Sequence, residues 1–135
     1  PKAKLIDILL VEDDEVDIMN VKRSFRKHGV QHRLSVARDG IEAFDHLRAR
    51  AKPHVILLDI NMPRMTGLEF LRALRAEPQF RDITVYIMST SDNPFDKSQA
   101  YSLNIAGYIV KPLSAESFSE CLIRLVNFWE ICEFP

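Results

Sequence analysis

Carboxylates, hydroxyls and a lysine stand directly after four short hydrophobic runs of this 135-residue chain. In chain order, the residues that follow these runs are Glu12-Asp13-Asp14, Asp59, Ser89-Thr90-Ser91 and Lys111-Pro112. In an open parallel sheet, polar groups at the carboxyl ends of the strands converge in one crevice, where ligands bind. Carboxylates from two strands, a lysine from a third and hydroxyls from a fourth would form a site for a divalent cation and a phosphoryl group.

The carboxylates have the chemistry that a magnesium ion requires. Mg²⁺ takes hard oxygen ligands in octahedral geometry, usually one or two carboxylates together with waters and phosphate oxygens. Asp13 and Asp59 are the natural pair, and Glu12 could hold a coordinated water. Taken alone, the acidic run could instead be the first turn of a helix, where the helix dipole favours negatively charged side chains.

Asp59 has an alternative of its own, a strand-terminal aspartate that caps the following turn. A carboxylate beside other carboxylates at the end of a buried strand is costly, however, and implies a counter-charge. A metal ion and Lys111 would supply that charge. Taken together, Asp13, Asp59, Ser89 and Lys111 form a much stronger signal than any of them alone.

Composition excludes several classes of protein. The net charge is −1, which favours neither nucleic acid nor an anionic membrane as a partner. No apolar stretch approaches the roughly 18 residues that span a bilayer, and the N-terminus shows no signal-peptide pattern, so we expect a cytoplasmic protein. Cys121 and Cys132 lie roughly 16 Å apart along one predicted helix, too far for a disulfide, and should be reduced thiols.

Strands and helices are predicted to alternate along the chain. The expected strands, which are short and mostly continuous apolar runs, are Ile6–Val11, Arg33–Ala37, Val55–Asp59, Val85–Met88 and Tyr108–Val110. The expected helices are Glu15–His28, Ile41–Arg50, Gly67–Ala76, Asp96–Leu103 and Ala115–Ile131. Five strands alternating with five helices predict an α/β fold, a flavodoxin-like (βα)5 three-layer sandwich with a parallel five-stranded sheet of order 2-1-3-4-5. We expect one domain over residues 1–135 without an attached output domain.

These motifs resemble the response-regulator receiver domain over essentially the whole chain. The matching stretches are Ile8 to Asp14, Ile56 to Pro63, Met65-Thr66-Gly67, Ile87-Met88-Ser89 and Gly107 to Pro112. The resemblance implies that Asp59 is the phosphoacceptor, with Mg²⁺ or a similar ion such as Mn²⁺ bound by Glu12, Asp13, Asp59 and the backbone carbonyl of Asn61. It also implies that Lys111 binds the phosphate, that Ser89 is the switch hydroxyl and that Tyr108 is the rotating aromatic residue.

The family resemblance also implies partners. A receiver takes its phosphoryl group from a sensor histidine kinase and signals by a conformational change, and it catalyses only its own phosphorylation and dephosphorylation. The Phe128 to Pro135 tail and the Thr90 to Asn93 loop are similar to those of single-domain regulators that partner bacterial and cyanobacterial phytochromes. Ser89 stands where threonine is commoner, and the tail lacks their leucine-proline ending.

Two other functions use the same residues. A small phosphohydrolase could use Asp59 as a covalent nucleophile, but it would need a second acid at position 61, where the chain has Asn61. A flavodoxin-like binding module without phosphotransfer would not need every charged member of the set. Transfer through a histidine is not favoured, because His28, His32, His46 and His54 share no site and are expected to be exposed.

The last predicted helix has more apolar residues than one buried stripe requires. These residues are Phe118, Leu122, Ile123, Leu125, Val126, Phe128, Trp129 and Ile131. An apolar patch of that size usually marks a partner surface, so we expect a homodimer through this helix with an aromatic residue such as Trp129 as the anchor. The alternative is that the last turn and the Phe134-Pro135 tail fold back over the domain.

Overall fold

The computed structural model describes residues 4–62, 64–112 and 114–135, and its strands and helices alternate along the chain as predicted. The strands are β1 (Asp7–Val11), β2 (Arg33–Ala37), β3 (Val55–Leu58), β4 (Thr84–Ser89) and β5 (Gly107–Val110). The helices are α1 (Glu15–Lys27), α2 (Gly40–Ala49), α3 (Gly67–Ala76), α4 (Pro94–Ser102) and α5 (Ala115–Trp129). The expected bounds differ from these by one or two residues at most.

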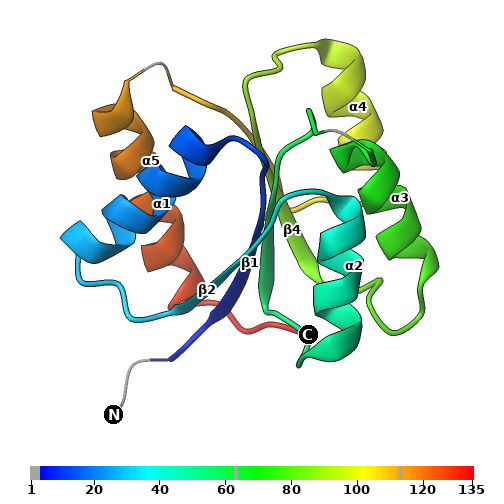
Figure 1. The fold of residues 1–135 in the computed structure, drawn as a ribbon, viewed down its shortest axis with the longest axis horizontal. Helices are drawn as coiled ribbons and strands as arrows, with labels where there is room; N and C mark the ends of the chain where they lie inside the picture. The colour runs from blue at the N-terminus through cyan, green and yellow to red at the C-terminus, as the bar shows by residue number, and fades with distance from the viewer. Residues whose placement is uncertain (1–3, 63, 113) are drawn as a thin grey trace.

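All five strands are parallel, in the order β2-β1-β3-β4-β5, which confirms the flavodoxin-like fold. Helices α1 and α5 cover one face of the sheet, and α2, α3 and α4 cover the other (Figure 1). Alternate residues of each central strand enter different cores, since Leu9 packs on the side of α2 and α3 whereas Leu10 packs on the side of α1 and α5. Burial on both faces explains why these strands read as continuous apolar runs.

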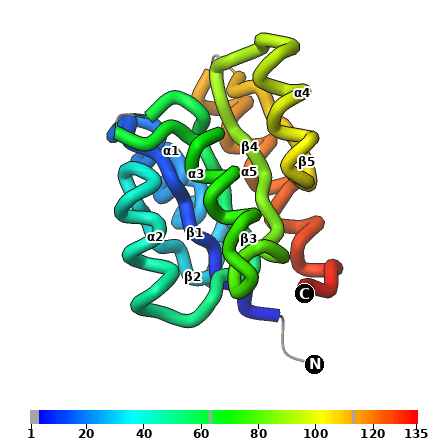
Figure 2. The backbone as a smooth tube through the Cα atoms, turned by 90° about the vertical axis from the view of Figure 1, so that its right-hand side faces the viewer, coloured from blue at the N-terminus to red at the C-terminus, as the bar shows by residue number. Residues whose placement is uncertain are grey.

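The C-terminal segment folds back over the domain, which is the alternative to a free apolar patch. Trp129 is 0% exposed and packs on Tyr86 of β4 with 5.5 Å between ring centroids. Beyond α5, the ring of Phe134 lies 5.6 Å from that of His54. Figure 2 shows the chain end beside the start of β1. The prediction that Trp129 anchors a dimer interface is therefore wrong, because the side chain is already buried within its own domain.

His32 also departs from expectation, because it is buried rather than exposed. Its Nδ1 accepts a hydrogen bond from the backbone N–H of Ile6 at 3.1 Å, and its Nε2 lies 2.9 Å from a Glu130 carboxylate oxygen. The ring therefore joins the start of β1 to the end of α5, and it has no part in the site at the opposite end of the sheet.

The two cysteines are free, as expected from their separation. Over the described ranges 4–62, 64–112 and 114–135, the longest apolar helices are still too short or too polar to cross a membrane.

Candidate functional site

Three carboxylates meet at the carboxyl ends of β1 and β3. Hydrogen bonds from the Glu12 N–H to the Ala37 carbonyl (2.9 Å) and from the Asp59 N–H to the Val11 carbonyl (3.0 Å) extend the strand ladders by one residue and fix both backbones. One oxygen from each of Glu12, Asp13 and Asp59 lies within 4.8 Å of the others. Glu12 and Asp59 are buried and Asp13 is exposed. A partly hydrated divalent cation fits this set, with Asp13 on the solvent side.

Lys111 brings a positive charge to the same edge of the sheet. Its backbone N–H donates to the Ser89 carbonyl at 2.8 Å, which continues the β4–β5 pairing and aims the side chain toward β1. The ammonium donates to Glu12 at 2.5 Å and to Asp17 at 2.7 Å, and the Lys111 side chain is only 8% exposed. The lysine thus lies between carboxylates, and one of them, Asp17, is a residue that the sequence analysis did not select.

A sequence signal for Asp17 does exist. Asp14 caps α1 by accepting from the N–H groups of Val16 and Asp17, which places Asp17 in the first helical turn. Asp17 stands one turn before the buried Val21, so it shares the helix face that packs on the sheet. An acidic residue on that face, near a predicted lysine, is the feature that would have identified it.

The charges around Glu12 are not balanced by the protein alone. Burial, opposed by the hydrogen bond from Lys111 and assisted by the nearby Asp59, raises the pKa of Glu12 to about 8. Burial lowers the pKa of Lys111, but hydrogen bonds to Asp17 and Glu12 outweigh that effect and raise it. Both Glu12 oxygens accept hydrogen bonds, from Lys111 and from the N–H groups of Asp13 and Asp14. These donors fit the ionised carboxylate, which an additional cation would favour, whereas burial favours the protonated form when no cation is bound.

The β3–α3 loop packs closely against the backbone of Asp59. The Gly67 N–H donates to the Ile60 carbonyl at 2.8 Å, and a Cβ at Gly67 would lie 2.2 Å from the Asp59 carbonyl oxygen. Position 67 therefore requires glycine. Thr66 and Glu69 form a capping box that begins α3 at this point. Asn61 is exposed, and its N–H donates to Asp59 at 3.3 Å.

An ion pair joins this loop to the start of α2. Arg64 has a positive φ of 62°, and its guanidinium donates to the carboxylate of Asp39, which also accepts from the Glu42 N–H as the N-cap of α2. Burial would raise the pKa of Asp39, but the Glu42 N–H and Arg64 outweigh it and lower that pKa. Sequence analysis missed this pair, because only the folded chain brings the two loops together.

Ser89 and Tyr108 meet at the backbone of Ser91. Ser89 is fully buried at the end of β4, and its hydroxyl oxygen accepts from the Ser91 N–H at 3.2 Å. Tyr108 is half-buried, and its hydroxyl donates to the Ser91 carbonyl at 2.8 Å. The Ser91 hydroxyl donates in turn to Asp96 in the first turn of α4 at 2.6 Å. One loop residue thus connects Ser89, Tyr108 and α4.

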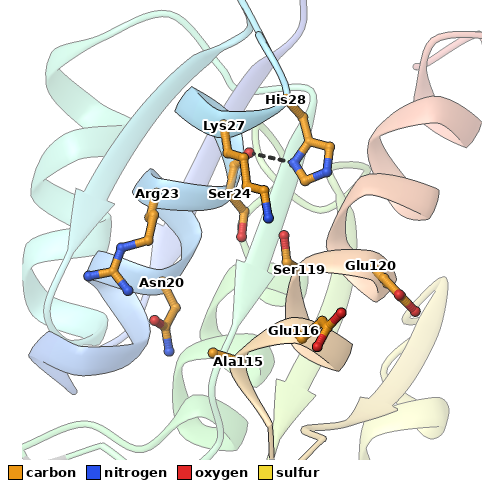
Figure 3. Close-up of a pocket in the computed structure, with 9 residues that line it drawn as sticks. All are labelled: Asn20, Arg23, Ser24, Lys27, His28, Ala115, Glu116, Ser119 and Glu120. Atoms are coloured by element: carbon orange, nitrogen blue, oxygen red, sulfur yellow. Dashed lines mark hydrogen bonds between the residues drawn. The ribbon is translucent and has the colours of Figure 1, made fainter.

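A hollow of about 410 Å³ lies between α1 and α5, away from these residues (Figure 3). Arg23 and Lys27 line it from α1, and Glu116 and Glu120 line it from α5. Its cations and carboxylates come from opposite walls, so it presents no single charge to a small ion. The cluster at the carboxyl ends of the strands is therefore the better candidate for binding a small ion.

Comparison with known proteins agrees with this geometry. The family of the response regulator receiver domain matches residues 8–122. Response regulator Rcp1 of Synechocystis sp. is 30% identical over 128 residues, which cover 90% of this chain and 87% of Rcp1. The crystal structure of the phosphorylated cyanobacterial phytochrome response regulator RcpA superposes with a TM-score of 0.90 at 32% identity, over 98% of this chain and 99% of RcpA. The Mn²⁺-bound form of Rcp1 gives a TM-score of 0.87 at 29% identity, over 96% and 99% of the two chains.

These similarities extend along nearly the full length of the chain, and they include the narrower group of phytochrome response regulators that the tail resembles. They favour neither a small phosphohydrolase nor a binding module without phosphotransfer. Proteins of this family are signalling proteins that accept a phosphoryl group. The chain belongs to the family of response regulator receiver domains.

Proposed function

We propose that this receiver accepts a phosphoryl group on Asp59 and that Mg²⁺ is required. The observation that carries the proposal is the convergence of the Glu12, Asp13 and Asp59 oxygens within 4.8 Å, with the Lys111 ammonium on Glu12. Carboxylate oxygens and a backbone carbonyl such as that of the exposed residue Asn61 are the ligand types that Mg²⁺ takes in proteins. Rcp1, which is similar to this chain along nearly its full length, has a crystal structure in a Mn²⁺-bound form, and this supports the binding of a divalent cation here.

In the proposed reaction, an Asp59 carboxylate oxygen attacks the phosphorus of a phosphohistidine. The new O–P bond forms as the P–N bond breaks, and the histidine nitrogen keeps the bonding electron pair. The bound cation would neutralise charge on the transferring phosphoryl oxygens. Lys111 would donate to one of those oxygens. Ser89 can donate to another, since its oxygen already accepts from the Ser91 N–H and its own hydrogen is free to turn.

The same site accounts for signalling and for limited self-catalysis. A phosphoryl group adds a charge of about −2, which would draw the Ser89 hydroxyl toward it. Tyr108 and α4 would follow, because both are bonded to Ser91. Slow hydrolysis of the acyl phosphate would return the protein to its resting state. We therefore propose that its catalysis is confined to its own phosphorylation and dephosphorylation.

The direct test is incubation with acetyl phosphate and Mg²⁺, followed by intact-mass measurement. Wild-type protein should gain one phosphoryl group, and chelation of the cation should prevent the gain. Asp59→Asn should gain none, and Asp13→Asn should need more Mg²⁺. Asp92→Asn is the control, because Asp92 is exposed and paired with Lys97 instead. Stable phosphate on Asp59→Asn would contradict the assignment.

We propose a phytochrome-type histidine kinase as the phosphoryl donor. RcpA is a cyanobacterial phytochrome response regulator, and this chain matches it over 98% of its own length. Purified, autophosphorylated kinases from the source organism should be compared for transfer within seconds. Faster transfer from a kinase without a phytochrome would overturn the pairing while leaving the receiver function intact. A cytoplasmic location goes with this proposal, and the two free cysteines suit a reducing compartment.

We also propose a homodimer through α5, with a different anchor residue from the one predicted from the sequence. Phe128 is 51% exposed and borders a hollow of about 380 Å³ next to Ile109 and Leu125. Phe128, rather than the buried Trp129, would then be the anchor. Light scattering at tens of micromolar should show a dimer for wild type and a monomer for Phe128→Asp. Asn127→Asp adds the same charge to the neighbouring exposed position and should stay dimeric. A monomeric wild type, before and after phosphorylation, would exclude the dimer.

A further inference from the structure

Lys111 is engaged by two carboxylates that differ greatly in exposure. Its ammonium lies 2.5 Å from Glu12 and 2.7 Å from Asp17. Among the contacts described for residues 4–62, 64–112 and 114–135, Asp59 forms no ion pair with this lysine. The Glu12 side chain is 3% exposed, whereas that of Asp17 is 27% exposed. A phosphoryl group on Asp59 must therefore compete with an existing partner for the ammonium.

A small cavity connects the competing groups. It has a volume of about 10 Å³ and is lined by Asp17, Asp59 and Lys111, with walls that include Leu57, Met88 and Phe118. Asp17, Lys111 and Asp59 thus border one small space whose other walls are largely apolar. Interactions between charges are strong in such surroundings, because little water screens them.

The difference in exposure decides which carboxylate gives up the lysine. Removing the counter-charge from a carboxylate as buried as Glu12 leaves a charge that water cannot reach, which is strongly unfavourable. Asp17 lies at the rim, where water can solvate its carboxylate after the lysine leaves, and a partly exposed ion pair is worth little. The exchange therefore costs least when Lys111 keeps Glu12 and leaves Asp17.

We propose that Asp17 is a positioning residue that holds Lys111 in the unphosphorylated protein and releases it to the phosphoryl group on Asp59. No covalent bond changes in this step, since one ion pair is exchanged for another. Asp17 then sets how readily the phosphorylated state forms, and its release frees the first turn of α1 from β5. This inference rests on the proposed phosphorylation of Asp59.

The test is a ¹⁹F NMR titration with beryllofluoride and Mg²⁺, since beryllofluoride binds as a noncovalent mimic of the phosphoryl group. Asp17→Asn should bind it about threefold to tenfold more tightly than wild type, because the amide no longer competes for Lys111. Asp17→Glu restores the carboxylate and should return the affinity to near the wild-type value. Glu15→Gln is the matched control, because it removes the same charge from the same turn but pairs with Arg38 instead of Lys111. It should change the affinity by less than about twofold.

A double-mutant comparison separates this role from a general effect of charge. In a Lys111→Ala background, Asp17→Asn should no longer tighten binding, since there is no ammonium to release. The inference is overturned if Asp17→Asn behaves like Glu15→Gln, or if its effect persists without Lys111. Failure of the proposed function looks different. Wild-type protein would then neither bind beryllofluoride nor gain phosphate from acetyl phosphate.

Discussion

The carboxyl end of the sheet buries Glu12 and Asp59 near each other, and Lys111 pairs with Glu12. The amino end instead buries His32 and half-buries His54 against the backbone. The His32 and His54 rings accept from the N–H groups of Ile6 and Asp7 at 3.1 and 2.9 Å. Each of these two hydrogen bonds at the amino end joins a donor to an acceptor. At the carboxyl end like charges face one another.

This difference indicates what each end does. A buried polar group that is hydrogen-bonded to the backbone contributes to stability and specifies local structure. Buried carboxylates that face each other are unfavourable until a cation arrives, so they are found where a ligand is to be bound. The amino end therefore stabilises the fold and the position of the C-terminal tail. The carboxyl end is less stable than it could be, because its buried carboxylates are arranged to bind a ligand. Substitutions at the two ends should separate these roles.

We expect the largest effect on stability at the amino end of the sheet. Trp129→Ala should lower the free energy of unfolding by about 3–5 kcal/mol, because it empties a fully buried site against Tyr86. Urea denaturation measures this loss. The folded fraction should still gain phosphate, since the indole packs beside β4 away from Asp59. Trp129→Phe, which keeps a ring, should lose less than about 1.5 kcal/mol. Loss of phosphorylation in folded Trp129→Ala protein would contradict the view that the amino end acts on stability alone.

His32→Ala should cost about 1–3 kcal/mol in the same measurement, because it leaves the Ile6 N–H without its acceptor. The exposed His28 provides the control, and His28→Ala should stay within about 0.5 kcal/mol of wild type. Phosphorylation by acetyl phosphate should be unchanged in both variants. Equal stabilities for the two variants would show that the buried ring adds nothing at this end of the sheet.

Sequence reasoning succeeded at the carboxyl end for a physical reason. Strand order and parallel direction bring strand-terminal residues to one edge, so Asp13, Asp59 and Lys111 could be placed together from local patterns alone. Asp17 escaped because its partner is 94 residues away and its role depends on the rotation of α1 about its axis. His32 was missed because its burial depends on how the end of α5 folds against the start of β1. Trp129 continues the buried stripe of Phe118, Leu122 and Val126 at helical spacing, so the periodicity of α5 did indicate its burial.

At the carboxyl end, removing a charge should stabilise the protein. Above pH 8, where Glu12 is ionised, Asp59→Asn should raise the free energy of unfolding by about 1–2 kcal/mol without metal, because it relieves repulsion with the buried Glu12. By the proposed function the same variant should not be phosphorylated, so stability should rise as function is lost. Asp13→Asn should gain less, since Asp13 is exposed and its charge is screened. A destabilised Asp59→Asn would show that Asp59 is a structural carboxylate, and the contrast between the two ends would fail.

The smallest expected effect is a pH dependence that also comes from the carboxyl end. Burial raises the pKa of Glu12 to about 8 from its ordinary value of 4.5. Between these values the folded protein holds a proton that the unfolded chain has lost, so stability falls as pH rises and levels off above pH 8. Metal-free protein should lose about 1 kcal/mol between pH 7 and 8, a window above the ordinary titration of histidine. Saturating Mg²⁺ favours the ionised Glu12 and should flatten this slope, as should Glu12→Gln without metal. A slope that is the same with and without Mg²⁺ would place Glu12 outside the cation site, while a slope that survives Glu12→Gln would assign the proton to another group.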